Sequence, residues 1–185
     1  MSALIPSGNA TGTGTMTLLA PPTNGTQTVT IPDATGTMMV SGNMPAFRAY
    51  LSSNQSISNS VNTKVQLNTE NFDTANCFDS TTNYRFTPNI AGYYQFSAVL
   101  ALSGTNITNG QALIYKNGAT ASNAVFYAPS LTGVSQINAV LSDLIYMNGS
   151  TDYVELYGYI SAVSSNLFGG NSAQAYLAGY LARAA

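Results

Sequence analysis

The chain has 185 residues, of which five are Lys or Arg, seven are Asp or Glu and none is His, so its net charge is −2. Only 6% of the residues are charged, against about 25% in an ordinary soluble domain. Five scattered basic residues do not form the positively charged surface that a nucleic-acid-binding protein needs. No apolar run approaches the roughly 20 residues that span a bilayer. The lack of His excludes Ser-His-Asp, Cys-His and imidazole–metal sites.

Residues 1–43 differ in composition and residue pattern from the rest of the chain. They contain three short Thr-rich pieces that begin at Thr11, Thr26 and Thr35, and Pro21-Pro22 and the turn signal Asn24-Gly25 lie between the first and the second. In the second piece Val29 and Ile31 share one face, which predicts a short strand rather than a flexible linker. Three short strands cannot bury enough apolar surface alone. We therefore expect residues 1–43 to be a β-rich attachment segment that binds a larger surface through Thr26, Val29, Ile31, Met38 and Met39.

The segment from Tyr84 to Leu102 is the clearest strand signal in the chain. Tyr84 and Phe86 share one face of a strand that Thr87-Pro88-Asn89 ends. After Gly92, apolar residues alternate with polar ones, as in a half-buried antiparallel strand. The face predicted to be buried contains Tyr94, Phe96, Ala98, Leu100 and Leu102, and the opposite face contains Tyr93, Gln95 and Ser97.

Residues 44–185 are predicted to form a single all-β domain, an antiparallel sandwich or jelly roll. Strand and turn signals recur about every 8–12 residues, and no helical periodicity of useful length is present. Residues 52–62 are polar and are predicted to be a loop. Besides those described above, the expected strands lie within residues 46–51, 64–73, 112–116, 136–147, 152–160 and 175–181, and the fourth of these is apolar on both faces in places.

Several of these segments resemble C1q/TNF-like domains, over roughly Pro45 to Ala182. The strongest match is F-T-P-N-I-A-G-Y-Y-Q-F-S at 86–97, and K-V-Q-L-N-T-E-N-F-D at 64–73, Y-K-N-G at 115–118 and the closing strand at 175–181 support it. Two extra residues separate Gly149 from Asp152, so that turn departs from the family pattern. The resemblance implies a jelly-roll sandwich that assembles as a tight homotrimer. Residues 1–43 are similar to Thr/Gly/Pro-rich modules of tailed-phage structural proteins, particularly marine and cyanobacterial ones.

The sequence contains few residues that could support catalysis. Cys77 has no basic neighbour to lower its pKa. Asp152 and Glu155 are expected on opposite faces of one strand, so they cannot simply pair as acid and base. We therefore expect no enzyme and no catalytic or cofactor residues. Because some C1q-like domains bind calcium, the resemblance allows calcium at Asp73, Asp79 or Asp152, but no D-x-D-x-D spacing supports it and solvated surface acids are the better interpretation.

Aromatic residues mark two candidate binding faces. Tyr153, Tyr157 and Tyr159 share one face of a strand, where they are expected to bind glycans or a partner, unless a neighbouring protomer or the N-terminal segment covers them. The last strand is apolar on both faces, which indicates a third layer supplied by oligomerisation. The residues expected at a trimer interface are Leu144, Tyr146, Tyr176, Leu177, Tyr180 and Leu181.

The preferred function is therefore a non-enzymatic virion structural protein. It would be a homotrimeric capsid decoration (cement) or head-fibre protein, whose N-terminal segment binds a major capsid or tail protein and whose knob projects. The N-terminus lacks a signal peptide, as expected for a virion protein assembled in the host cytoplasm. One alternative is a phage tail-fibre module that recognises host surface glycans. A second alternative is a secreted C1q-like recognition protein, which the lack of a signal peptide and of a collagen-like tract disfavours.

Overall fold

The computed structural model describes residues 44–127 and 133–185, and for residues 164–167 it describes the backbone only. Thr26, Val29, Ile31, Met38 and Met39 lie outside the described residues, so their attachment role stays a prediction. Within the described ranges every helix or strand is a β-strand, and all strand pairs are antiparallel. The prediction of an all-β antiparallel fold is thereby confirmed.

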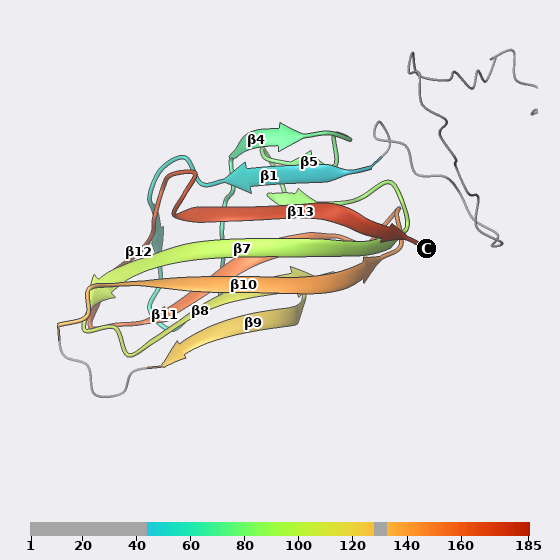
Figure 1. The fold of residues 1–185 in the computed structure, drawn as a ribbon. Coiled ribbons are helices and arrows are strands. Elements are labelled where there is room, and N and C mark those ends of the chain that lie inside the picture. Colours follow the sequence, from blue (N-terminus) through green and yellow to red (C-terminus); the bar gives the residue numbers. More distant parts are fainter. Residues whose placement is uncertain (1–43, 128–132) are drawn as a thin grey trace, which may run out of the picture. The chain divides into compact units, whose positions relative to one another are not determined.

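Two sheets form the fold, and the first is built around the long strand β7 (Figure 1). β7 pairs along one edge with β13 and β12 and along the other with β10, and β1 and β4 continue the sheet beyond β13. Its seven strands are β1 (Ala46–Tyr50), β2 (Gln55–Ile57), β4 (Thr69–Asp73), β7 (Gly92–Thr105), β10 (Gln136–Met147), β12 (Ser164–Phe168) and β13 (Ala175–Ala184).

The second sheet is built around β11, which pairs with β8 on one edge and with β6 and β3 on the other. β9 lies outside β8 at one edge of this sheet, and β5 lies outside β6 at the other. Its six strands are β3 (Thr63–Lys64), β5 (Phe78–Asp79), β6 (Arg85–Phe86), β8 (Asn109–Lys116), β9 (Ala119–Tyr127) and β11 (Val154–Ser161).

The core lies between the inner faces of the two sheets. On β7 the predicted apolar face is fully buried, because Tyr94, Phe96 and each alternate residue to Leu102 have no exposed area. At one end of the core, the rings of Phe47 and Phe86 stack 4.3 Å apart, and Phe86 also meets the ring of Tyr94 edge-on at 5.5 Å. These aromatic pairs join β1 of the first sheet to β6 of the second and fix the way the sheets pack.

Four local differences from the sequence prediction have physical causes. Residues 55–57 are strand β2 rather than loop, because they pair with β12, more than 100 residues later in the chain. β9 and β12 have no strong apolar alternation of their own and are likewise set by pairing partners. Tyr84 adopts φ +50° and precedes β6 rather than joining it.

Candidate functional site

The outer face of the first sheet exposes an unusual number of large apolar side chains. They come from three adjacent strands, β7, β10 and β13, and we call them the apolar face. Its members, with their exposed fractions, are Tyr93 (42%), Val140 (65%), Leu144 (52%), Tyr146 (42%) and Tyr180 (53%).

Pairing of the strands explains why these side chains gather. β7 and β10 run side by side over their full length, with Tyr93 opposite Tyr146 and Val99 opposite Val140. The rings of Tyr93 and Tyr146 meet edge-on, 5.4 Å between centroids. Residues opposite each other in an antiparallel pair have neighbouring side chains on the same face. Tyr93, Tyr146 and Leu144 therefore form one cluster on this face, and Gln95, Ser97 and Ser142 lie between this cluster and Val140.

A shallow hollow of about 250 Å³ adjoins the apolar face, over β4, β1, β13 and β7. Its floor contains small residues, among them Ala46, Ala178 and Gly179, while Phe72 and Tyr180 stand at its sides. Both of these rings are about half exposed. A floor of small residues between two aromatic rings has the shape to receive an apolar side chain from a partner.

The residues expected at a trimer interface divide between the two faces of the first sheet. Leu144, Tyr146 and Tyr180 lie on the apolar face, and Tyr176 lies on the same side, with the Arg48 guanidinium 4.1 Å above its ring. Leu177 and Leu181, however, have at most 1% of their area exposed and pack inside the sandwich. Assigning those two to an interface was wrong, because β13 uses its leucine face for the core of its own protomer and offers a partner only its tyrosine face.

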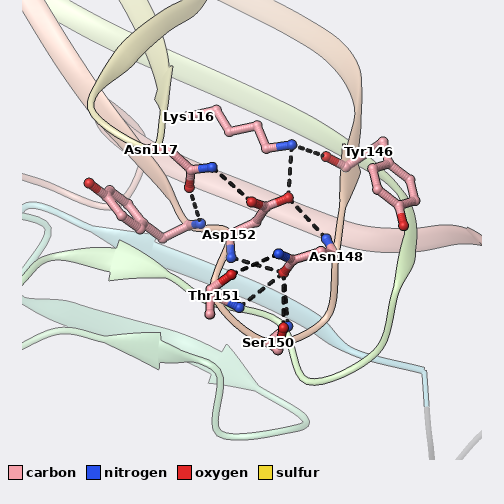
Figure 2. A network of polar contacts seen from close by, with 8 residues as sticks. Lys116, Asn117, Tyr146, Asn148, Ser150, Thr151 and Asp152 are labelled. Atoms are coloured by element: carbon pink, nitrogen blue, oxygen red, sulfur yellow. Dashed lines mark hydrogen bonds and ion pairs between the residues drawn. The ribbon is translucent and has the colours of Figure 1, made fainter.

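A polar network supports one end of the apolar face (Figure 2). The ammonium group of Lys116 binds the Asp152 carboxylate at 2.8 Å and donates to the backbone oxygen of Tyr146 at 2.7 Å. It also lies 5.7 Å from the centroid of the Tyr146 ring. Asp152 is 9% exposed, and hydrogen bonding from Lys116, then Asn117 and the backbone of Asn148, lowers the pKa of its carboxyl. The network therefore ties the end of β10 to the β8–β9 turn.

Asn148 holds the turn between β10 and β11. Its side-chain oxygen accepts hydrogen bonds from the backbone N–H groups of Ser150, Thr151 and Asp152, each at 3.0 Å (Figure 2). Gly149 adopts φ +72°, and a Cβ there would lie 2.3 Å from the backbone nitrogen of Ala91. The two extra residues of this turn are thus accommodated by an asparagine cap and a glycine.

The predicted tyrosine row lies on the outer side of the second sheet and is half-buried. Tyr157 stacks on Tyr115 with ring centroids 4.0 Å apart, and burial raises the pKa of its hydroxyl. Tyr153 has the guanidinium of Arg85 4.3 Å above its ring. Tyr159 lies opposite Gln111 on β8 and is also partly buried. Two of the three tyrosines thus have one ring face against the chain's own side chains, and their role in binding a glycan or partner stays a prediction.

The candidate calcium ligands bind backbone N–H groups of their own loops. Asp73 accepts hydrogen bonds from the N–H groups of Ala75 and Phe78. The N–H of Thr82, with further donors from Thr81 and Asn83, holds the pKa of the Asp79 carboxyl well below its usual range. Among the described residues, no group of three or more Cys, Asp or Glu side chains is placed to hold a metal ion.

The remaining ionisable groups offer no acid–base machinery. Burial raises the pKa of the Cys77 thiol, the opposite of what an activated nucleophile requires. Glu155 is buried and bound to Lys64 at 2.6 Å, while Asp152 binds Lys116, so the two carboxylates have different partners. Over residues 44–127 and 133–185 there is no helix long and apolar enough to cross a membrane.

The sequence analysis did not assign two members of the apolar face, Tyr93 and Val140, or Phe72 beside the hollow, to a binding surface. Tyr93 was placed on the polar face of β7, and Val140 and Phe72 were not singled out. The signal that identifies them is pairing: once β7 and β10 are aligned in register, Tyr93 and Val140 fall on the same outer face as Leu144 and Tyr146. Alternation within β10 already places Val140 on the same face as Leu144 and Tyr146, but only the pairing shows that Tyr93 of β7 lies beside Tyr146.

Comparison with known proteins identifies the fold. The structure is similar to the crystal structure of murine APRIL, with a TM-score of 0.57 and 9% identity over 75% of this chain and 98% of that chain. It is also similar to the structure of Eiger TNF from S. frugiperda, with a TM-score of 0.59 and 8% identity over 77% of this chain and 93% of that chain. No family model and no curated protein sequence matches the chain. The described domain therefore has a TNF-like jelly-roll fold.

Proposed function

We propose that the chain is a non-enzymatic structural protein of a virion, a homotrimeric capsid decoration or head-fibre protein. The observation that carries the homotrimeric part of this proposal is the apolar face. Five large apolar side chains are exposed on this one sheet face, and rings such as Tyr93, Tyr146 and Tyr180 are enriched at the centres of protein interfaces. A second copy of the chain is the occupant that we infer.

Low charge supports self-association. None of the five members of the apolar face is an Asp, Glu, Lys or Arg residue, so a second copy can cover them without desolvating a charge. Ring closure by a heterologous contact needs two different patches on one molecule. The first sheet offers such a pair, namely Leu144 and Tyr146 on β10 and the hollow between Phe72 and Tyr180. The resemblance to C1q/TNF-like domains supports closure at three copies.

Sedimentation of the full chain tests the assembly. We expect a species of about three times the 19.3 kDa of one chain, stable at micromolar concentration. A single 19.3 kDa species under those conditions would contradict the proposal, because the apolar face would then be stable in water.

The virion role rests on residues 1–43, whose Val29/Ile31 strand pattern resembles attachment modules of tailed-phage proteins. Immunogold labelling of particles produced from the genome that encodes the chain tests this role. We expect label over the capsid. We also expect that Val29→Asp with Ile31→Asp, in the full chain, removes the protein from particles while leaving it trimeric. Label at the tail alone, or no label, would reject decoration of the capsid.

A further inference from the structure

A second hollow lies at the other end of the first sheet, about 33 Å from Tyr93 at the roughly 3.3 Å per residue of a strand. It measures about 160 Å³ and is lined by Asn54, Ala101, Ser103, Gln136, Gly169 and Gln174. Ser103 of β7 lies directly opposite Gln136 of β10. Asn54, Gly169 and Gln174 come from the loops that flank β2 and β12. We call this cavity the carboxamide hollow, because three of its six lining residues carry a carboxamide group.

Hydrogen bonds within the chain orient two of the carboxamides. The Asn54 side-chain oxygen accepts from the N–H of Gly170 at 2.8 Å, and the Gln174 side-chain oxygen accepts from the Asn171 amide at 2.6 Å. Both oxygens are therefore engaged, and the NH₂ ends of these side chains are the groups left to donate to a ligand. Within the described chain, Gln136 and Ser103 have no side-chain hydrogen bond, so both are available as donor and acceptor.

The chemistry of the lining selects a class of ligand. None of the six residues is ionisable, so a charged ligand would lose hydration without gaining a counter-charge. Carboxamides and a hydroxyl bind groups that both donate and accept, which is the character of a sugar hydroxyl. The hollow is smaller than the roughly 300–1,000 Å³ of sites that enclose drug-sized molecules. A volume of about 160 Å³ suits a ligand no larger than one sugar ring, and Ala101 and Gly169 are the two lining residues without a polar side chain.

The position of the hollow suits recognition. The backbone N–H of Leu181 binds the oxygen of Pro45 at 2.9 Å, and Leu181 lies opposite Tyr94, so the chain enters this domain at the Tyr93 end of β7. The carboxamide hollow lies at the Ser103 end. The hollow therefore lies at the opposite end of the first sheet from Pro45.

We propose that the carboxamide hollow binds a single neutral sugar residue, such as the end of a surface glycan. The site is distinct from the tyrosine row of the second sheet, on which the sequence placed glycan binding. Gln136, Ser103 and the amide groups of Asn54 and Gln174 hold the sugar hydroxyls. This gives the protein a recognition function in addition to its structural one.

Binding of methyl glycosides of glucose, galactose, mannose and N-acetylglucosamine to the full chain tests the proposal, with glucuronic and sialic acid as charged comparators. Titration followed by NMR or calorimetry reads binding without any particle, so it can fail while capsid attachment holds, and the reverse. We expect at least one neutral glycoside to bind, and neither acid to bind as well. If no neutral glycoside binds with a dissociation constant below about 10 mM, or if an acid binds more tightly, the proposal is overturned.

Variants locate the site. Gln136→Ala removes a side chain that makes no hydrogen bond within the described residues, so it should leave the fold intact and weaken binding about 3- to 10-fold, the effect of one neutral hydrogen bond. Ser103→Leu fills the hollow and should abolish binding. Gln111→Ala, on the outer face of the second sheet, is the matched control and should leave binding unchanged. Binding that survives Gln136→Ala and Ser103→Leu but is lost in Tyr157→Ala would assign the ligand to the tyrosine row and overturn the proposal.

Discussion

Lys64 and Lys116 each bind a buried carboxylate, and both ion pairs join segments far apart in the sequence. Exposed ion pairs contribute little to stability, but removing one partner of a buried pair leaves an uncompensated charge and costs more. In a chain with so few charges, these lysines and carboxylates act as internal ties between loops and strands. The sequence indicated that Asp152 and Glu155 would not pair with each other, but it could not show which lysine each would bind.

We predict that Asp152→Asn lowers the free energy of unfolding at neutral pH by about 2–3 kcal/mol, because it removes a charge-assisted bond to Lys116. The difference in the free energy of unfolding between Asp152→Asn and the native protein should decrease at low pH. The pKa of the Asp152 carboxyl is lower in the folded protein than in the unfolded chain, so its contribution is complete above the ordinary value of about 3.9 and disappears as the pH falls through the folded value.

Denaturant unfolding of both proteins between pH 7 and pH 3 measures this difference. Thr120→Ala, at an exposed site on β9 with no titratable side chain, serves as a control for general acid effects. If the free energies of unfolding of Asp152→Asn and of the native protein differ by the same amount at every pH down to pH 3, the pKa of this carboxyl is not lowered in the folded protein.

Among the strands, those with strong alternation were predictable and those without it were not. β10 spans Gln136–Met147, the same residues that the sequence predicted, because one face is apolar at Ile137, Ala139, Leu141, Ile145 and Met147, with only Asp143 interrupting it. β2, β9 and β12 were missed because their pairing partners, rather than their own side chains, make them strands. The Asn117-Gly118 turn was predictable from its residues, and both adopt the positive φ that such a hairpin turn needs.

Gly158 is where β11 comes closest to the first sheet. A Cβ at this position would lie 2.4 Å from the ring of Phe168 and 2.5 Å from Leu100. We predict that Gly158→Ala destabilises the domain by about 1–3 kcal/mol, because the two sheets must separate or the ring must move. Thr120→Ala, at an exposed site on β9, is the control and should cost less than about 1 kcal/mol. Thermal unfolding followed by circular dichroism measures both, and equal effects would mean that the sheets do not pack closely at Gly158.

For the whole molecule, sequence motifs were sufficient for the fold but not for the binding surface. Motifs such as F-T-P-N-I-A-G-Y-Y-Q-F-S predicted the jelly roll, which the structure confirms. On β13, however, leucines and tyrosines alternate, and apolar character alone could not tell which face meets the second sheet. Only the register against β7 shows that Leu177 and Leu181 belong to the core and that Tyr180 faces outward.

Two matched substitutions, one on the outer face of each sheet, test the assembly. Leu144 on the first sheet and Val125 on the second are almost equally exposed, at 52% and 54%. Leu144→Glu and Val125→Glu therefore introduce the same charge at similar exposure, and neither disturbs the core. If copies associate through the apolar face, Leu144→Glu buries an unpaired carboxylate in each contact, at a cost of several kcal/mol per contact.

We predict that Leu144→Glu reduces the trimer to single chains at micromolar concentration, whereas Val125→Glu sediments like the native protein. Circular dichroism of both variants checks that the sandwich is folded. The opposite pattern would assign the contact to the second sheet, and dissociation of neither variant would exclude the apolar face as the contact. Because a heterologous ring uses two patches, Ala178→Leu, which fills the hollow beside Phe72 and Tyr180, should dissociate the trimer as well. Dissociation by Leu144→Glu but not by Ala178→Leu would favour a contact in which the β10 residues meet their own counterparts.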